Sequence, residues 1–424
     1  MADQSLGESA YYSKQQPPIT ERPARKPHVI AYYTSWSIYA RNFQPADIHS
    51  EHLTHLLYAF ANVTPDGEIA LGDRWADIDK PFPGDNPQQQ PPPPFMGAIG
   101  QINNPNGPVR RRNPHLRTLI SVGGWTWSRN FSNTLATPAS REKFANSCIA
   151  FMTQYGFNGI DIDFEYPVEG GIEGMPHRPD DAINLASFMA LLRSKLDALS
   201  AQTKRKYDLM MAVSANPKNI HHYIVGPDGS SPLKTLAKVC DTINIMAYDF
   251  AGSWSSHTGH QASLFAPSFD PKFFSGHQAV NLFVAGGAPP EKLAVGVPFY
   301  GRGFAQVRQE PHRKEQQVGL NCEFHGSPQG SWEQGVFDYA HIAREHLQPG
   351  SGYVRYWDPT AKAPFLFSES QRVFISYDDE AAIAEKTKYV VERRLGGVFA
   401  WELSNDRNAV LLNSISKTLH HKTS

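Results

Sequence analysis

The sequence has few cysteines and no long apolar run. Its 424 residues include three cysteines. The wide spacing of Cys148, Cys240 and Cys322 excludes a full disulfide framework and a cysteine-based metal site. No apolar stretch reaches the roughly 18 residues that a membrane-spanning helix needs. We therefore expect three buried thiols and no association with a membrane.

Charge of one sign is not in excess either. The chain has 40 Lys and Arg residues against 41 Asp and Glu residues, which gives a formal net charge of -1. This balance provides no positive surface for nucleic acid, and we interpret the short basic run at 110–112 as a solvated loop. The 17 histidines show no HExxH spacing, so we expect no metal ion and no other cofactor.

Two polar segments lie outside the apolar pattern. Residues 1–27 combine prolines with basic residues and lack the apolar run of a secretory signal. We interpret them as a flexible tail and expect a cytoplasmic or non-classically released protein; the alternative is a secreted protein whose signal peptide has been replaced. Residues 81–94, with the run QQQPPPP, predict a proline-rich surface loop, for which partner binding is a weaker alternative.

What the sequence does contain is eight short apolar segments, each followed by a polar or glycine-bearing turn. They are residues 28–34, 55–61, 117–123, 159–165, 208–214, 241–248, 293–300 and 396–403. Helix-period patterns separate several of them, most clearly at 140–155, 182–199 and 380–395. Eight alternations of strand and helix predict an α/β fold, a (β/α)8 TIM barrel, whose functional residues lie at the carboxyl ends of the strands.

One interval is too long for a loop between strand and helix. Between the seventh predicted strand and the last helix, the sequence holds short strand-like pieces rich in aromatic residues and turns. We interpret 303–376 as a small α+β insertion that raises one wall of a cleft, within a barrel that spans 28–424.

Three carboxylates occupy alternate positions in the fourth predicted strand, within the run FNGIDIDFEYP at 157–167. Asp161, Asp163 and Glu165 should point to one face, because successive side chains of a strand alternate. Clustered like charges raise one another's pKa, and burying an unpaired carboxylate is costly. A solvated face of an antiparallel sheet and a metal site are the alternatives. A buried parallel strand that ends in a loop favours catalysis.

Aromatic and polar residues gather at the same ends of the other predicted strands. Sugar rings stack their apolar faces on aromatic side chains and form hydrogen bonds through their hydroxyls. The mixture therefore predicts a carbohydrate site. Its residues are Tyr32, Trp36, Ser121, Trp125, Met246, Tyr248, Asp249, Arg302 and Trp401.

Most of these residues, although not Tyr32, Trp36 and Trp401, lie in sequence blocks that resemble the glycoside hydrolase family 18 chitinases, of the fungal or bacterial type with an α+β insertion. The blocks are SxGGW at 121–125, DxDxE at 161–165, MxYD at 246–249 and VPFYGRGF at 297–304. The resemblance extends from Tyr32 to Trp401. It departs at Asn158 and Phe164, where the family commonly has Asp and Trp; neither belongs to the acid series, although Asn158 bears on how the first aspartate is held.

The resemblance implies hydrolysis of chitin and N-acetylglucosamine oligosaccharides, with retention and with the substrate's acetamido oxygen as nucleophile. Glu165 would donate the proton, Asp163 would bind the acetamido N–H and Asp161 would orient Asp163. Tyr248 would fix the acetamido group for attack. We expect the protein to be a monomer. The resemblance also implies that Tyr32 and Ser121 support the aspartates. The sugar would be bound by Met246, Asp249, Arg302 and Trp401. The outer cleft would be lined by Trp36, Trp125, Trp254 and Glu333.

Three other functions fit parts of the pattern. A chitin-binding lectin on the same fold typically lacks the acid, whereas Glu165 is present. An endo-β-N-acetylglucosaminidase acting on N-glycans would share the acid pair, but the cleft aromatics and the insertion favour a linear chain. A purely structural or storage barrel would not need intact catalytic blocks.

Overall fold

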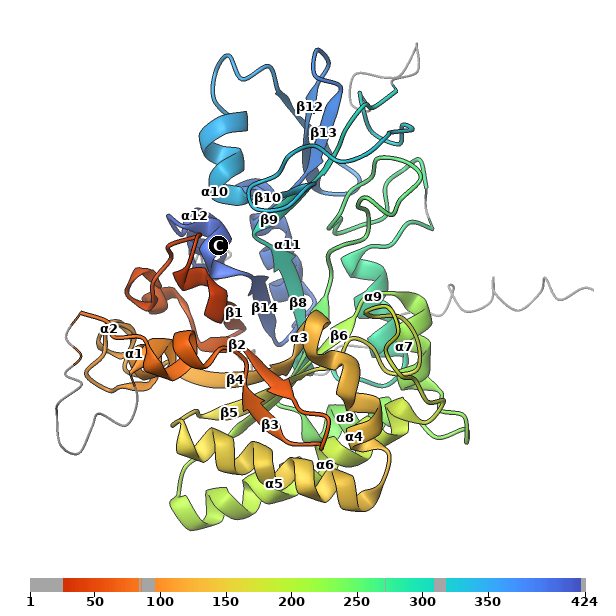
Figure 1. Cartoon of the computed structure of the whole chain (residues 1–424). Coiled ribbons are helices and arrows are strands. Elements are labelled where there is room, and N and C mark those ends of the chain that lie inside the picture. Colours follow the sequence, from red (N-terminus) through yellow and green to blue (C-terminus); the bar gives the residue numbers. More distant parts are fainter. Residues whose placement is uncertain (1–25, 84, 86–95, 271, 309–317, 421–424) are drawn as a thin grey trace, which may run out of the picture.

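Eight parallel strands close into a barrel in the computed structural model, which describes residues 26–420 except 84, 86–95, 271 and 309–317 (Figure 1). The strands are β1 (His28–Thr34), β2 (His55–Val63), β4 (Arg117–Gly123), β5 (Gly159–Asp163), β6 (Asp208–Ser214), β7 (Thr242–Met246), β8 (Leu293–Pro298) and β14 (Gly397–Trp401). They follow the order β1-β14-β8-β7-β6-β5-β4-β2, and pairing of β1 with β2 closes the ring. The short β3 (Ile69–Leu71) adds to β2 in antiparallel. The predicted (β/α)8 barrel is confirmed.

Helices connect the strands and surround the barrel (Figure 1). They are α1 (Gly97–Asn103), α2 (Pro108–Arg112), α3 (Gly124–Trp127), α4 (Phe131–Leu135), α5 (Pro138–Gln154), α6 (Asp181–Thr203), α7 (Pro217–Ile224), α8 (Pro232–Val239), α9 (Gly276–Ala285), α11 (Glu380–Glu392) and α12 (Val410–His420). Local signals set their ends: Thr137 accepts the Ser140 N–H before α5, and Pro138 occupies its first position. Among the described residues, no helix is long and apolar enough to cross a membrane.

Alternation along each strand gives the barrel two apolar layers. In β1, Ile30 and Tyr32 point into the barrel, whereas Ala31 and Tyr33 pack outward toward the helices. In β5, Ile160 and Ile162 belong to the outer layer. The intervening positions of β5 therefore face the barrel interior, and these are the positions that carry aspartates.

A second, antiparallel sheet follows β8 and stands above the carboxyl ends of the barrel strands (Figure 1). It comprises β9 (Tyr300–Phe304), β10 (Val336–Asp338), β11 (Val354–Asp358), β12 (Ala363–Ser368) and β13 (Val373–Ser376), in the order β10-β9-β13-β12-β11, with the short α10 (Tyr339–His341) after β10. Asp338 ties it to the barrel by accepting hydrogen bonds from Arg41 Nη1 and Asn405 Nδ2, each at 2.7 Å. The predicted insertion, 303–376, falls within this second sheet and its connections, which begin earlier, at Tyr300.

Several predicted boundaries were wrong. β5 ends at Asp163, so Glu165 lies beyond the strand, where its backbone N–H donates to Ser128 Oγ instead of a neighbouring strand. β7 covers only 242–246, and β8 ends at Pro298, because Tyr300 already pairs with Asp338 in the second sheet. The predicted tail at 1–27 lies outside the described residues except for 26 and 27, and most of the proline-rich segment at 81–94 lies outside them as well.

The basic run at 110–112 is not a solvated loop but the end of α2. Arg110 Nη2 donates to Thr118 Oγ1 and to Asn158 Oδ1, each at 2.9 Å. Asn158 therefore anchors the amino end of β5, at the opposite end from Asp163. Phe164 is buried against Phe131, with ring centroids 4.9 Å apart, so neither departure from the family pattern lies at the acids.

Candidate active site

The inner aspartate, Asp161, is fully buried and is held on both carboxylate oxygens. Its Oδ2 accepts hydrogen bonds from Ser121 Oγ at 2.7 Å and Tyr32 Oη at 2.9 Å, and Oδ1 accepts one from Asn244 Nδ2 at 3.5 Å. Burial raises the pKa of Asp161 to about 6, although these hydrogen bonds act to lower it. The structure thus brings the predicted Tyr32 and Ser121 to Asp161 and adds Asn244, an inward position of β7 that sequence analysis missed.

The middle aspartate, Asp163, is buried with less support. Its Oδ1 has no hydrogen-bond partner among the described residues. Burial, and then the charges of Glu165 and Asp161, raise the pKa of Asp163 well above its ordinary value. Gly123 pairs with Asp163 across β4 and β5, and only glycine fits there, because a Cβ would lie 2.3 Å from the Asp163 carbonyl oxygen. The φ of Gly123 is +108°.

Glu165 lies just above the two aspartates and is half-buried. Its backbone N–H donates to Ser128 Oγ at 2.8 Å, and the same hydroxyl donates to the Gly124 carbonyl at 2.8 Å. Burial raises the pKa of Glu165 to about 7; a hydrogen bond with Tyr166 lowers it, and Asp249 raises it. Ser128 and Tyr166 were not predicted, since nothing in the local sequence distinguishes them from ordinary loop residues.

Tyr248 and an ion pair form the neighbouring wall. Asp249 accepts two hydrogen bonds from the Arg302 guanidinium, at 2.9 and 2.8 Å, and one from Tyr300 Oη at 2.7 Å. The Tyr248 ring lies 6.2 Å from that of Tyr300. Burial, then Tyr300, Asp163 and Glu165, raise the pKa of Tyr248 well above its ordinary value, so its hydroxyl stays protonated beside the acids.

Aromatic rings continue from the barrel interior to the surface. The Trp401 ring stacks on Phe60 with centroids 5.6 Å apart and lies 5.3 Å from Tyr32 and 6.4 Å from Trp36. Met246 is buried in the same apolar cluster. Trp36 is 39% exposed, so the cluster leads from buried rings to one that a ligand can reach. Phe60 was not predicted, because an apolar residue in a strand ordinarily indicates core.

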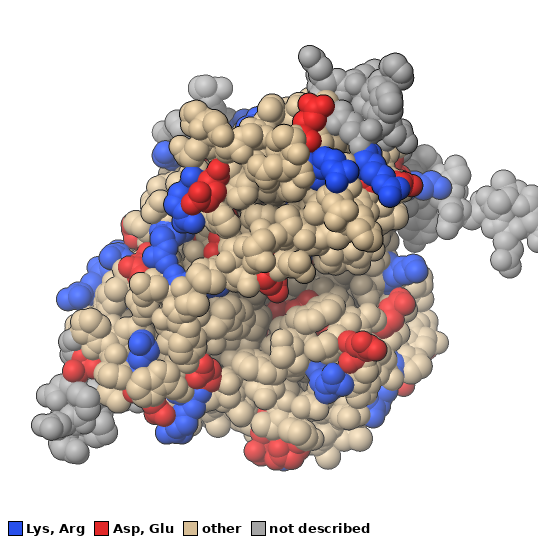
Figure 2. All heavy atoms as spheres, turned by 45° about the horizontal axis from the view of Figure 1, so that its top comes forward, with Lys and Arg blue, Asp and Glu red and all other residues tan. Residues whose placement is uncertain are grey.

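The outer predicted residues are more exposed and lie farther along the face. Trp125 and Trp254 are 51% and 59% exposed. The Arg302 guanidinium lies 5.0 Å from the Trp254 ring centroid, which connects this ring to the Asp249 ion pair. Glu333, in the insertion, is exposed and contributes to raising the pKa of Arg302. Figure 2 shows this face hollowed between the insertion and the barrel, with acidic atoms at the bottom of the hollow.

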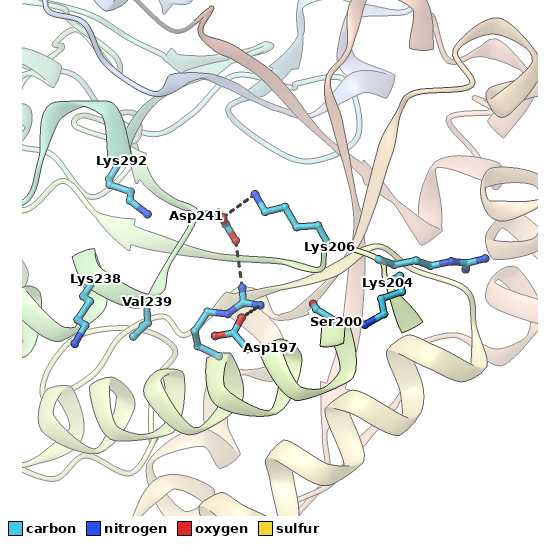
Figure 3. A pocket seen from close by; sticks show the side chains of 10 residues that line it. Asp197, Ser200, Lys204, Lys206, Lys238, Val239, Asp241 and Lys292 are labelled. Atoms are coloured by element: carbon cyan, nitrogen blue, oxygen red, sulfur yellow. Dashed lines mark hydrogen bonds and ion pairs between the residues drawn. The ribbon is translucent and has the colours of Figure 1, made fainter. Parts of the chain in front are cut away.

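A separate basic hollow of about 580 Å³ borders the amino ends of β7 and β8, away from the acids (Figure 3). Its own acids neutralise part of it: Asp241 lies 3.0 Å from Lys206 Nζ and 3.4 Å from Arg193 Nη1. Lys204 and Lys238 lie on opposite sides of the hollow in Figure 3 rather than converging. We therefore assign it no role in the chemistry.

A barrel that buries an acid series at one strand end, beside stacked aromatic rings and a half-buried glutamate, defines a glycoside hydrolase. The chain belongs to glycoside hydrolase family 18. Residues 28–406 match the family described as Glycosyl hydrolases family 18, which includes the whole barrel up to β14 and the insertion.

Known chitinases resemble the chain over nearly its full length. Chitinase A1 from Niallia circulans is 38% identical over 442 residues, and the match covers 95% of this chain but 60% of that protein. A solved chitinase from Bacillus thuringiensis superposes with a TM-score of 0.83 at 32% identity, covering 93% of this chain and 70% of the other. A class V chitinase from Nicotiana tobaccum, solved in complex with NAG4, gives a TM-score of 0.72 at 26% identity, covering 93% and 99%.

The buried Asp163 carboxyl, whose Oδ1 lacks a hydrogen-bond partner among the described residues, should lower the stability of the folded chain. Its pKa is raised in the folded chain, so ionised Asp163 destabilises the folded state at neutral pH. This cost is absent below about pH 4, where the carboxyl is protonated in both states. Asp163→Asn should therefore raise the midpoint of thermal unfolding by a few degrees at pH 7 and have little effect at low pH.

Asp161→Asn is the matched control, because Asp161 accepts hydrogen bonds on both carboxylate oxygens, whereas an amide keeps one acceptor oxygen and places a donor against the partners of the other. It should bring no gain in stability at pH 7. Calorimetry at pH 4 and pH 7 measures both variants. An Asp163→Asn variant that is less stable than the natural chain at pH 7 would contradict the account.

Proposed function

We propose that the chain is a chitinase that hydrolyses β-1,4-linked N-acetylglucosamine chains with retention, using the substrate's own acetamido group. The observation that carries the proposal is the graded series of buried carboxyls below Glu165. Its similarity to proteins named chitinases, one of them solved with NAG4, supports the choice of substrate.

Glu165 suits the role of general acid. Its pKa of about 7 keeps the carboxyl largely protonated up to near neutral pH. In the first step Glu165 gives its proton to the glycosidic oxygen as the bond from that oxygen to the anomeric carbon breaks. In the second step the resulting carboxylate accepts a proton from water, which attacks the same carbon. One residue thus serves both steps.

Neither aspartate suits the role of nucleophile. Hydrogen bonds occupy both oxygens of Asp161, which is fully buried. Asp163 is 3% exposed, so little of its carboxyl is open to form a bond with the anomeric carbon. The acetamido oxygen of the sugar then attacks the anomeric carbon instead, giving an oxazolinium ion. Two successive inversions at that carbon produce retention.

Asp163 and Tyr248 would place the acetamido group for this attack. The Oδ1 of Asp163 lacks a partner among the described residues and can accept the acetamido N–H. Its negative charge stabilises the positive charge that develops on the ring. The protonated Tyr248 hydroxyl can donate to the acetamido oxygen and hold it below the anomeric carbon. Asp161, fixed behind Asp163, would hold Asp163 in position whether the Asp161 carboxyl is ionised or protonated.

The surrounding residues would bind the sugar chain. The stacked Trp401 ring offers a flat apolar face on which a pyranose can lie. The Arg302 and Asp249 pair presents donors and acceptors to hydroxyls at the other side. Exposed Trp36, Trp125 and Trp254 extend this stacking surface along the hollow face of Figure 2.

Glu165→Gln should remove hydrolysis of N-acetylglucosamine oligomers, by at least about 100-fold, because the amide has no proton to give. Binding of the same oligomers, measured by calorimetry, should persist. In the unaltered enzyme kcat should fall as pH rises through about 7, since the acid then loses its proton. Glu142→Gln, a surface residue paired with Lys195, is the control and should keep full activity. A Glu165→Gln variant that keeps its activity would contradict the assignment of Glu165 as the general acid.

Substrate assistance predicts that fully deacetylated glucosamine chains are not cut, because they have no oxygen with which to attack. The comparison uses acetylated and deacetylated hexamers at equal concentration, with product analysis over the same time course. An inverting or carboxylate-nucleophile mechanism has no such requirement. Equal cleavage of the two chains would therefore rule out the proposed nucleophile while leaving the role of Glu165 intact.

A further inference from the structure

A group of metal-binding side chains lies outside the site described above, on the short 3-10 turn η4 (Ser50–His52) that precedes β2. His49 Nδ1 lies 3.0 Å from Glu51 Oε1, and His52 Nε2 lies 3.9 Å from the same oxygen. All three donor atoms lie within 4.8 Å of one another. Among the described residues, this is the only group of three or more such side chains that meets this criterion.

The chemistry of the three donors suits zinc. Two imidazole nitrogens and one carboxylate oxygen are a common zinc ligand set, with water in the fourth position. Zinc binds nitrogen and oxygen at roughly 2.0 to 2.2 Å, so two donors on one tetrahedral ion lie about 3.3 Å apart. The two measured separations, 3.0 and 3.9 Å, lie on either side of that value. Small side-chain rotations therefore suffice to form the site.

The backbone that carries these donors is fixed in place. Ser50, between the two histidines, is buried, and its Oγ donates to the Val109 carbonyl at 2.8 Å. Asn113 Nδ2 donates to the carbonyls of Ser50 and Leu53, at 2.9 and 2.8 Å. Because the turn is anchored on both sides, binding an ion requires ordering of side chains but not of backbone.

The donors are also accessible and adjoin the last helix. The side chains of His49 and Glu51 are 44% and 42% exposed, so an ion can enter from solvent. Helix α12 packs against η4, and His420 at its end lies within electrostatic range of His52. An ion held here would stabilise the folded chain where its first and last barrel elements meet, because the anchored turn holds the three ligands close together and therefore binds the ion more tightly than the unfolded chain does.

We propose that His49, Glu51 and His52 form a binding site for a zinc-class divalent metal ion, separate from the catalytic face and with a stabilising role. The spacing His-Ser-Glu-His differs from the HExxH pattern of helical zinc sites, so a search for that pattern does not find it. The ion takes no part in hydrolysis, since the three ligands have no contact with the acid series.

Titration calorimetry of the full chain with zinc chloride tests the proposal. We expect saturable binding that is weakened at least about tenfold by Glu51→Gln and by His52→Ala, because each removes a direct ligand. His222→Ala is the matched control: it removes a half-buried histidine that pairs with Glu169 at 2.8 Å but is not part of such a group. This variant should bind zinc as the unaltered chain does.

Thermal unfolding supplies a second readout that does not depend on activity. Zinc should raise the unfolding midpoint of the unaltered chain and of His222→Ala, and leave that of Glu51→Gln unchanged. Midpoints measured with a chelator should agree among the three proteins, which shows that each folds. Absence of zinc binding, or binding by the Glu51→Gln and His52→Ala variants as tight as that of the unaltered chain, would overturn the proposal.

Discussion

Like charges buried at one strand end are the constraint on which the site depends. Asp161 and Asp163 are enclosed in the barrel, and Glu165 lies directly above them. Burial and mutual repulsion disfavour ionisation of each carboxyl. The three acids therefore differ in their hydrogen bonding. Asp161 accepts hydrogen bonds from three donors, and Asp163 has one oxygen without a partner among the described residues. Glu165 keeps its proton to near neutral pH.

The rest of the fold makes this arrangement tolerable. Outward-facing isoleucines anchor β5 in the apolar layer between strands and helices, while β1, β4 and β7 contribute Tyr32, Ser121 and Asn244 to the deepest acid. The insertion adds a wall without adding charge to the acids. It is joined to the barrel through Asp338 and brings Arg302 to Asp249. The rigid barrel therefore offsets the cost of burying the acids, and loops at its rim carry the residues proposed to contact the sugar.

Sequence periodicity predicted the barrel because strands buried on both faces read as short apolar runs, and eight of them alternate with helical patterns. Because side chains two residues apart in a strand share a face, Asp161 and Asp163 were predicted to lie on the same face of β5. Asn244, Ser128 and Phe60 escaped prediction because their roles arise from contacts between residues distant in sequence, whereas Tyr166, next to Glu165, resembles an ordinary loop residue in the local sequence. The ends of β5 and β8 were misjudged for a related reason: the chain leaves the barrel ladder to meet Ser128 and Asp338, and neither partner is local.

The central claim is that cleavage proceeds by two inversions at the anomeric carbon, the first of them made by a nucleophile on the face opposite the water attack. Anomer analysis of the first products from N-acetylglucosamine oligomers, followed by proton magnetic resonance before mutarotation, tests it most directly. The account predicts that new reducing ends appear first as the β anomer, the configuration of the bond that is cut. Initial release of the α anomer would show a single inversion by water and would contradict the account.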